Sequence, residues 1–136
     1  MIIQKITKKD SLDIWSWRND IKSIFFSKNK KKITFEKHNK WFKKNLKNKK
    51  IKFYIGSLIN NNKKEKVGVV RFDIKSKYAL VSINLNPVMR GKSLSYILLA
   101  AGIKKFFKFK KIKLIAEIKK NNLASINCFQ KNKFHF

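Results

Sequence analysis

The stretch NPVMRGKSLSYILLA, residues 86–100, joins a segment of alternating apolar residues to a long apolar helix pattern. It holds the only proline of the chain, Pro87, and one of its four glycines, Gly91. A helix that begins directly after a strand leaves its first N–H groups without intrahelical partners, and these groups favour an anion such as phosphate. The stretch therefore predicts either a phosphate-binding turn or an ordinary capped connection, and the loop alone does not choose between them.

The segments on both sides of this loop predict a single α/β domain over residues 1–136, in the order β-α-α-β-β-β-α-β-α. Residues 51–86 have a period near two and indicate an antiparallel meander. The strand after the long helix is expected to run parallel to the strand before it, because a helix separates the two. The expected strands are 1–7, 51–59, 67–75, 78–86 and 111–119, and the expected helices are 9–20, 34–48, 94–109 and 121–132. The segments 23–34 and 60–66 read as a loop and a turn.

The charge is strongly positive, with 35 Lys and Arg against 7 Asp and Glu, a net charge of +28. Such a chain attracts phosphate-rich partners, so non-specific binding of nucleic acid to the basic surface is one interpretation. The positive residues are nearly all lysine and are spread along the chain, together with many Asn, Ile and Phe residues that share AT-rich codons. Codon bias of an AT-rich genome is therefore an alternative explanation for the charge.

Several classes are excluded or made less favourable by the composition. A lone cysteine, Cys128, excludes an internal disulfide, and no cluster of metal-ligand type is present, so no metal is expected. The N-terminus lacks the apolar core of a signal peptide, and the longest apolar run, 96–103, is too short to cross a bilayer. We therefore expect a cytoplasmic protein without a membrane association.

Three motifs resemble the GNAT family of N-acetyltransferases. Arg90-Gly91-Lys92-Ser93-Leu94-Ser95 resembles the pyrophosphate loop of that family, Arg/Gln-x-x-Gly-x-Gly/Ala, with serine at both later glycine positions. The segment AEIKKNNLASINCFQKNKF, residues 116–134, resembles the last conserved segment of the family, with Lys133 at its usual glycine. The segments WSWRNDIKSIFFS, TFEKHNKWF and VSINLNPVMRGKSL are similar to a bacterial branch that acts on nucleotide-linked amino sugars of the pseudaminic and legionaminic acid pathways.

This resemblance implies a GNAT acyltransferase fold, with a mixed, mostly antiparallel sheet and flanking helices. It implies an enzyme that transfers acetyl from acetyl-CoA to a primary amine, with the amine of a nucleotide-linked amino sugar as the expected acceptor. A protein N-terminus, as in the ribosomal-protein branch, is the alternative acceptor. The alternative that is not an enzyme is a degenerate GNAT domain that binds RNA or another polyanion.

The resemblance also implies a set of site residues. The strand before the loop is expected to pair with the pantetheine arm, and the last helix to flank it. His38 suits proton relay through a water, although a partly buried structural histidine is an equal alternative. The residues expected to bind acetyl-CoA are Ile83, Leu85, Arg90, Gly91, Lys92, Ser93, Leu94, Ser95, Asn122, Ser125 and Phe129. The candidate catalytic residues are His38, Glu117 and Asn84, and the candidate substrate-binding residues are Arg18, Arg71 and Asp73.

Each substrate-binding candidate also has a structural interpretation. Arg18 could form a salt bridge with Asp13 or Asp20, and Arg71 could pair with Asp73 across one strand face.

Phe129 stands where many GNAT enzymes have a tyrosine that protonates the leaving thiolate, so that acid is expected to be missing. GNAT domains usually continue with another strand or hairpin after the last helix, so the chain reads as shortened, and a homodimer could cover the resulting strand edge.

Overall fold

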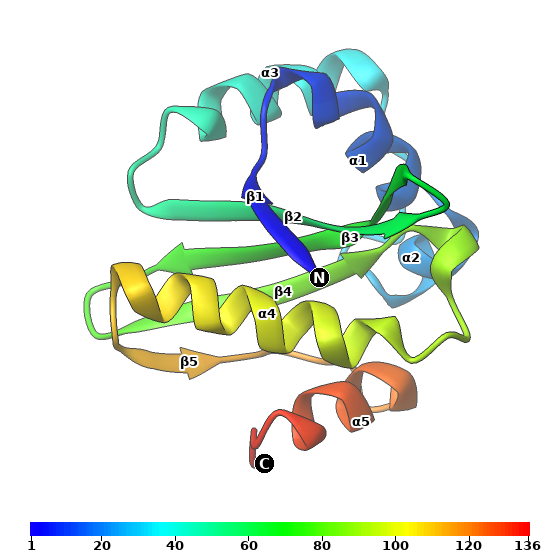
Figure 1. The fold of residues 1–136 in the computed structure, drawn as a ribbon. Helices are drawn as coiled ribbons and strands as arrows, with labels where there is room; N and C mark the ends of the chain where they lie inside the picture. Colours follow the sequence, from blue (N-terminus) through cyan, green and yellow to red (C-terminus); the bar gives the residue numbers. More distant parts are fainter.

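The structure, a computed structural model, describes residues 1–136 and has a five-stranded sheet in the order β1-β2-β3-β4-β5 (Figure 1). The first four strands pair antiparallel, and β5 runs parallel to β4, as the sequence predicted. The strands are β1 (Ile2–Lys5), β2 (Ile51–Asn60), β3 (Lys63–Ile74), β4 (Tyr78–Leu85) and β5 (Lys113–Ile115). The helices are η1 (Lys8–Asp10), α1 (Ser11–Arg18), α2 (Ile21–Phe26), α3 (Phe35–Leu46), η2 (Pro87–Met89), α4 (Leu94–Phe109) and α5 (Leu123–Lys131). No helix is long and apolar enough to cross a membrane.

Helices cover both faces of the sheet, and each face has its own apolar core (Figure 1). Between α4, α5 and the sheet, Phe72 stacks on Phe106 with ring centroids 4.3 Å apart. On the opposite face, Trp17 of α1 and Phe42 of α3 are buried against Phe53 of β2. Successive side chains of a strand point to opposite faces of the sheet. Alternate residues of the meander therefore contribute to one core, and the residues between them contribute to the other.

The expected turn at 60–66 is wrong, because β2 and β3 continue almost to its centre. Asn60 pairs with Lys63, and only Asn61 and Asn62 form the turn. Both asparagines have positive φ, 49° and 62°, the conformation that a two-residue type I′ hairpin requires and that asparagine tolerates. Lys63 and Lys64 lie on the exposed end of the hairpin, whereas Lys66 is half-buried.

The expected loop at 23–34 is also wrong in its first part, because α2 occupies Ile21–Phe26. Asp20 caps this short helix by accepting hydrogen bonds from the backbone N–H groups of Lys22 and Ser23. The structure thus has three helices between β1 and β2 rather than the two that the sequence predicted. Thr34 caps α3, because its side chain accepts a hydrogen bond from the Lys37 N–H.

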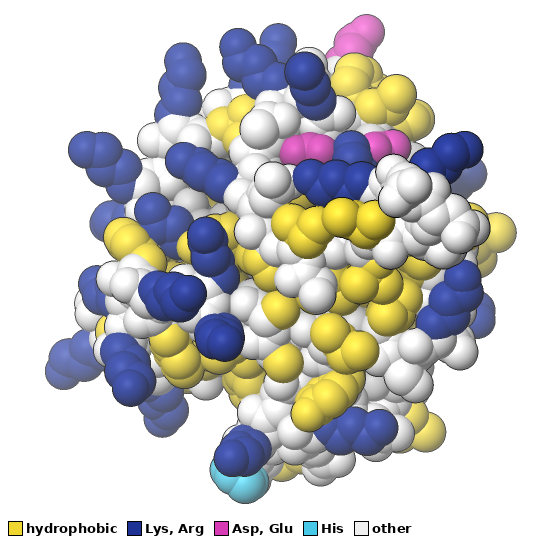
Figure 2. Space-filling model, viewed as in Figure 1, with side chains coloured by type: hydrophobic (Ala, Val, Ile, Leu, Met, Phe, Trp, Pro, Cys, Tyr) yellow, Lys and Arg dark blue, Asp and Glu magenta, His cyan; other side chains and the backbone are white.

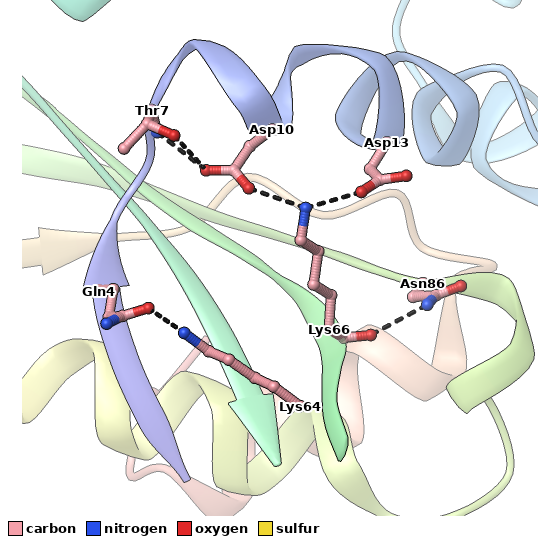
Figure 3. A network of polar contacts seen from close by, with 7 residues as sticks. All are labelled: Gln4, Thr7, Asp10, Asp13, Lys64, Lys66 and Asn86. Atoms are coloured by element: carbon pink, nitrogen blue, oxygen red, sulfur yellow. Dashed lines mark hydrogen bonds and ion pairs between the residues drawn. The ribbon is translucent and has the colours of Figure 1, made fainter. Parts of the chain in front are cut away.

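A polar network joins α1 to the hairpin (Figure 3). Lys66 Nζ lies 2.9 Å from Asp10 Oδ1 and 2.7 Å from Asp13 Oδ2, and Asp10 also accepts from the Thr7 backbone N–H. The Asp10 side chain therefore makes no capping hydrogen bond to α1, although Asp10 stands at the N-cap position. Burial lowers the pKa of Lys66, but its hydrogen bonds to Asp13 and Asp10 outweigh burial and raise it. The network fixes α1 over β3.

The last strand is shorter than the nine residues 111–119 expected from the sequence. β5 pairs with β4 only at Tyr78–Lys113, Ala79–Leu114 and Leu80–Ile115. Beyond these pairs, β4 continues to Leu85 while the chain leaves β5 for an irregular segment. The two strands therefore separate at the end of β4 that leads into the loop before α4.

Candidate active site

The floor of the candidate site is set by the pairing of β2, β3 and β4. Arg71 of β3 lies between Phe53 of β2 and Ser82 of β4, and the next row along the sheet pairs Val69 with Asn84. Residues directly opposite one another in antiparallel strands share a face. This face is the one that α1 and α3 cover.

A cavity of about 210 Å³ lies between these strands and the helices α1 and α3. It brings together five residues that the sequence singled out, on four elements far apart in the chain. It is lined by Ile14, Arg18, His38, Trp41, Phe53, Val69, Arg71, Ser82, Ile83 and Asn84. No carboxylate lines it.

His38 lies in the wall of this cavity and is fully buried, at 0% exposure. Neither of its ring nitrogens makes a hydrogen bond of ordinary geometry in the protein, and the weaker contact with the Ser11 backbone acts to raise its pKa. Burial, and then the charge of Arg18, lower the pKa of His38 below its usual 6.5. The imidazole is therefore neutral at pH 7, with a nitrogen available to accept a proton.

Two guanidinium groups share the indole of Trp41 in the same cavity. The Arg18 guanidinium lies 5.3 Å from the ring centroid, and the Arg71 guanidinium lies 5.4 Å from it. Arg71 Nε also pairs with Asp73 Oδ1 at 3.1 Å, as the structural interpretation of this pair predicted. Burial, and then the charge of Arg71, lower the pKa of Arg18.

Arg18 itself has no acidic partner. Asp13 pairs with Lys66, and Asp20 pairs with Arg90, so neither of the salt bridges suggested by the sequence forms. The Arg18 side chain is exposed at the cavity and makes no hydrogen bond with the protein. Its donors are free for a ligand.

Asn84 is held by a chain of contacts that leads away from the cavity. Its Oδ1 accepts from the Ser23 hydroxyl at 3.1 Å, and Ser23 Oγ accepts in turn from Arg90 Nη2 at 3.2 Å. Arg90 Nη2 pairs with Asp20 Oδ2 at 2.7 Å, and this contact with Arg90 is the main cause of the lowered pKa of Asp20. The Arg90 side chain is thus engaged by α2, and its place in the site is to join the loop to Asn84.

The loop before α4 presents backbone donors to solvent. Gly91 has φ of 75° and Ser93 has φ of 57°, so the backbone turns through the left-handed region twice. None of the amides from Gly91 to Tyr96 donates to an acceptor in the protein. Because such amides at the start of a long helix favour an anion, the loop fits the diphosphate of a coenzyme.

The outer edge of β4 presents a second row of free backbone groups. Asn86 N–H donates to Val67 O, and Lys75 N–H donates to Tyr78 O, which sets the alternation of hydrogen bonds between β3 and β4. By this alternation Ser82 and Asn84 bond to β3, whereas Ile83 and Leu85 point their N–H and C=O groups outward. Since β5 ends its pairing at Leu80, these groups are free to pair with an extended amide-containing chain.

The family model described as the acetyltransferase (GNAT) domain matches residues 1–135. The chain belongs to the GNAT family. This assignment confirms the fold that the sequence predicted and makes the protein an acetyltransferase. A comparison with curated proteins gave no match.

Solved structures share the GNAT fold of this chain. A domain from Methanocaldococcus jannaschii superposes with a TM-score of 0.87 at 24% identity, over 98% of this chain and 87% of the other. A ribosomal-protein-alanine N-acetyltransferase from Brucella melitensis gives 0.81 at 19% identity, over 99% and 85%. The spermidine N-acetyltransferase from Vibrio cholerae, solved with CoA and spermine, gives 0.81 at 12% identity, over 96% and 78%.

Several residues expected in the GNAT site lie outside the cavity. Glu117 is exposed after β5 and pairs with Lys28, Nζ to Oε2, at 3.1 Å. Asn122 caps α5, its side chain accepting from the Ser125 N–H at 3.3 Å. Phe129 is buried in the core beneath α4 and α5, at 3% exposure. The structure therefore gathers His38 and Asn84 in one place and leaves Glu117 apart from them.

Three residues of the GNAT site were not identified from the sequence as site residues. Trp41 and Ser82 received no individual role there, and Ser23 fell in the expected loop. Period-two alternation places Ser82 and Asn84 on one face of a strand, and this signal was available in the sequence. The contact of Ser23 with Asn84 spans 61 residues and left no sequence signal.

Proposed function

We propose that this GNAT protein transfers acetyl from acetyl-CoA to a primary amine held in the cavity of His38, Arg18 and Arg71. One observation carries the proposal: Ile83 and Asn84 are neighbours on β4, the first with its amide on the open edge and the second with its side chain at the cavity. A thioester paired with the edge would therefore lie next to an amine in the cavity. Acetyl-CoA supplies the activated acetyl group for this reaction.

The free amides of the loop from Gly91 to Tyr96 would hold the diphosphate of acetyl-CoA. The outward amides of Ile83 and Leu85 would hold the extended pantetheine arm and donate to the thioester oxygen, where negative charge develops. Lys92 lies in the same exposed loop and adds positive charge. These groups are already in position in the free protein, so little reorganisation is required on binding.

His38 is the better candidate for proton acceptor in this proposal. It is neutral at pH 7, lines the cavity and has both ring nitrogens unpartnered. Glu117 is exposed and paired with Lys28 outside the cavity. His38 lines the cavity whereas Glu117 lies outside it, so His38 is the candidate nearer to the acceptor amine. Because its ring is fully covered, a side-chain movement must uncover it before it accepts a proton directly or through one water.

A protein acid for the departing thiolate is not provided at the aligned position, because Phe129 has no hydroxyl and is buried. We infer that a water protonates the thiolate and that the protein contributes mainly by aligning the two reactants. Effective molarities of aligned groups can supply roughly 7–11 kcal/mol of a barrier, so strong acid–base groups are not essential.

The proposed acceptor is the amine of a nucleotide-linked amino sugar, in line with the resemblance of the segments around Trp17, His38 and Arg90. A protein N-terminus is the second candidate. The structural likeness to the ribosomal-protein-alanine N-acetyltransferase supports that alternative, as a likeness of fold. Neither acceptor requires a metal ion in the cavity.

The first experiment measures acetyl-CoA binding by calorimetry in the wild type, Ser93→Asp and Ser93→Asn. Ser93 is exposed, and both replacements tolerate its left-handed backbone. The carboxylate of Ser93→Asp would repel the diphosphate, so we expect at least tenfold weaker binding than in the isosteric Ser93→Asn. No binding by the wild type, or equal affinity in the two variants, would reject this placement of the coenzyme.

The second experiment measures acetyl transfer to a panel of UDP-linked amino sugars and of peptides that begin with alanine. Transfer to a sugar amine supports the leading proposal, and transfer to the peptides alone supports the alternative. Binding of RNA without any acetyl transfer would contradict both. The salt dependence of RNA binding would identify a purely electrostatic surface interaction.

Figure 2 shows Lys and Arg side chains spread around the visible face rather than gathered in one patch, which is not typical of a dedicated nucleic-acid surface.

A further inference from the structure

The acidic residues of the chain are all placed away from the cavity. None of the seven lines it. Those that form ion pairs are Asp10 and Asp13 with Lys66, Asp20 with Arg90, Asp73 with Arg71, and Glu117 with Lys28. Only Asp73 contacts a residue of the cavity, and it is occupied by that contact. A polycationic acceptor would therefore meet two arginines and no carboxylate.

The two arginines are arranged for a ligand rather than for internal pairs. Arg18 has no partner except the face of Trp41, and Arg71 keeps its terminal nitrogens free, because its only ion pair uses Nε. The two guanidinium groups repel each other, and Arg18 has no carboxylate nearby that would offset this repulsion. A guanidinium without a carboxylate partner is a strong binder of phosphate or carboxylate, because its donors match two oxygens at once.

A third group in the cavity is also unpartnered. His38 is completely buried, and neither ring nitrogen makes a hydrogen bond of ordinary geometry with the protein, although the backbone of Ser11 lies close enough to raise its pKa slightly against the larger effect of burial. Native proteins rarely leave buried polar groups without partners, so an unpartnered one in a cavity wall indicates that a ligand or water completes it. The cavity is thus prepared for polar groups on its floor and at its mouth.

We propose that Arg18 and Arg71 bind an oxyanion of the acceptor, a phosphate or carboxylate located a few ångströms from the amine that receives the acetyl group. The inference rests on the proposed acetyl transfer and specifies its substrate class. It distinguishes this protein from an enzyme for polyamines, such as the spermidine N-acetyltransferase that shares its fold.

The cavity size limits which part of the acceptor enters. A liquid water occupies roughly 30 Å³, so a cavity of about 210 Å³ has room for about seven waters. A monosaccharide-sized group matches this volume, whereas a whole nucleotide would extend out of the cavity. The oxyanion therefore lies at the mouth, where Arg18 is exposed, and the amine-bearing portion lies deeper, near His38 and Asn84.

The same cations assist the chemistry. An acceptor amine must be neutral before it attacks, and nearby positive charges lower the pKa of an amine. Arg18 and Arg71 thus favour the reactive form of the amine while they hold the anionic part of the acceptor. This effect would compensate for the absence of a carboxylate base in the cavity.

The test is calorimetric titration with inorganic pyrophosphate, UDP and acetate, each at moderate salt and in the presence of saturating CoA. CoA occupies the loop before α4, so the remaining anion binding reports on the cavity. The variants are Arg18→Gln and Lys44→Gln. Lys44 is an exposed residue of α3 without an ion pair, so the control removes the same charge from the same side of the protein.

We expect UDP or pyrophosphate to bind to the wild type with CoA present, and Arg18→Gln to bind at least tenfold more weakly. Lys44→Gln should change affinity less than twofold. Preference for acetate over pyrophosphate would identify a carboxylate as the natural oxyanion. Equal losses in the two variants, or no anion binding by a folded wild type, would overturn the inference.

Two further measurements separate this inference from the proposed function. If acetyl-CoA binds but Arg18→Gln leaves the affinity for anions unchanged, the proposed acetyl transfer is retained and the proposed oxyanion site is rejected. If acetyl-CoA fails to bind, the anion titrations without CoA still compare Arg18→Gln with Lys44→Gln. Efficient acetylation of spermidine by the wild type would reject the oxyanion directly. The melting temperature of Arg18→Gln is expected to match the wild type, because Arg18 makes no internal hydrogen bond or ion pair.

Discussion

Arg90 and Asp20 form an ion pair, Nη2 to Oδ2 at 2.7 Å, that joins the loop before α4 to the start of α2. Both side chains are partly buried, at 30% and 25% exposure, and the contact continues through Ser23 to Asn84 in the cavity. The segment that presents backbone donors to the coenzyme is thereby connected to the wall of the acceptor site. Displacing α2 should therefore affect the acceptor before it affects the coenzyme.

Asp20→Asn tests this connection. Asparagine retains the helix cap of α2 but loses the charge that pairs with Arg90, so we expect about 0.5–1 kcal/mol of lost stability. The KM for the acceptor should rise more than the KM for acetyl-CoA. Urea unfolding and steady-state kinetics measure the two effects.

Controls for the Asp20 prediction follow from other contacts. Lys28→Gln breaks the exposed pair with Glu117 and should leave stability unchanged. Asp20 has a lowered pKa, so its contribution is present above the usual value of 3.8 and is lost as the pH falls through the folded-state pKa. Equal acceptor and coenzyme effects in Asp20→Asn would contradict the role of α2.

Ser93→Gly should stabilise the protein. Ser93 has φ of 57° at the start of α4, where a side chain costs about 1 kcal/mol relative to glycine, and its hydroxyl makes no capping bond. We expect a gain of 0.5–1 kcal/mol, on the order of that strain, with acetyl-CoA affinity kept or improved. Thermal unfolding and calorimetry measure both.

The matched control is Ser95→Gly, since Ser95 has ordinary helical geometry two residues later. Glycine there should cost about 0.5 kcal/mol, because it lowers helix propensity without relieving strain. A marked loss of acetyl-CoA affinity in Ser93→Gly would show that the site uses the hydroxyl rather than the small size of serine.

His38 makes stability depend on pH near neutrality. Because burial and Arg18 lower its folded-state pKa below 6.5, the unfolded chain binds more protons as the pH falls below 6.5. Stability from this group is therefore complete above pH 6.5 and decreases as the pH falls toward the folded-state pKa. The backbone of Ser11 acts in the opposite direction on the pKa of His38, and Arg71 is the other charged residue that lines the cavity.

His38→Phe should remove that pH dependence, since Phe35 and Phe42 already surround the ring. Melting temperatures between pH 5 and pH 8 measure the change against wild type. The exposed His135 supplies the control: His135→Gln should leave the pH profile as it is. The proposed proton acceptor would also be lost, so kcat should fall by a factor of 10² or more in His38→Phe.

Lys133→Gly should stabilise the end of α5. The Phe134 N–H donates to Phe129 O, and the Lys133 N–H donates to Gln130 O. The ring centroids of Phe134 and Phe129 lie 5.0 Å apart. These contacts form a Schellman motif, whose left-handed residue, here Lys133 with φ of 68°, is usually glycine. We expect a gain of about 1 kcal/mol.

Lys133→Ala is the control for the charge. It removes the lysine side chain but leaves a Cβ in the left-handed conformation, so its stability should stay near that of the wild type. Similar gains in Lys133→Gly and Lys133→Ala would attribute the effect to charge repulsion on a chain of net charge +28 instead of backbone strain.

Much of the fold could be predicted from the sequence, because the local pattern of apolar residues agreed with the strand pairing that the structure shows. The meander, the parallel last strand and the helix expected over 34–48 followed from the period of the apolar residues and the order of the elements. Of the three departures from the family motif, Ser93, Ser95 and Lys133, two are positions of positive φ, Ser93 and Lys133. There glycine is favoured for its backbone, which explains in physical terms why the motif contains it.

The errors arose where tertiary contacts determine local structure. Polar and lysine-rich stretches at 23–34 and 60–66 read as loops, although Asp20 caps α2 and strand pairing extends the hairpin to Lys63. The gathering of Arg18, His38 and Arg71 in one cavity depends on how α1 and α3 pack on the sheet. The partner of Arg90 on α2 was not predictable, because it lies 70 residues away in sequence.

The short ladder between β4 and β5 has a dynamic consequence. Only three residue pairs hold β5 to the sheet. The segment that follows contacts the residues just after α2, where Lys119 Nζ donates to Ser27 O and Glu117 forms an exposed pair with Lys28. Regions with few buried contacts open at lower free energy than the core. We therefore expect residues 113–122 to exchange amide hydrogens faster than β2 and β3. Such local opening would widen the gap beside β4 without disturbing the meander, and so give a long coenzyme a way out after each turnover.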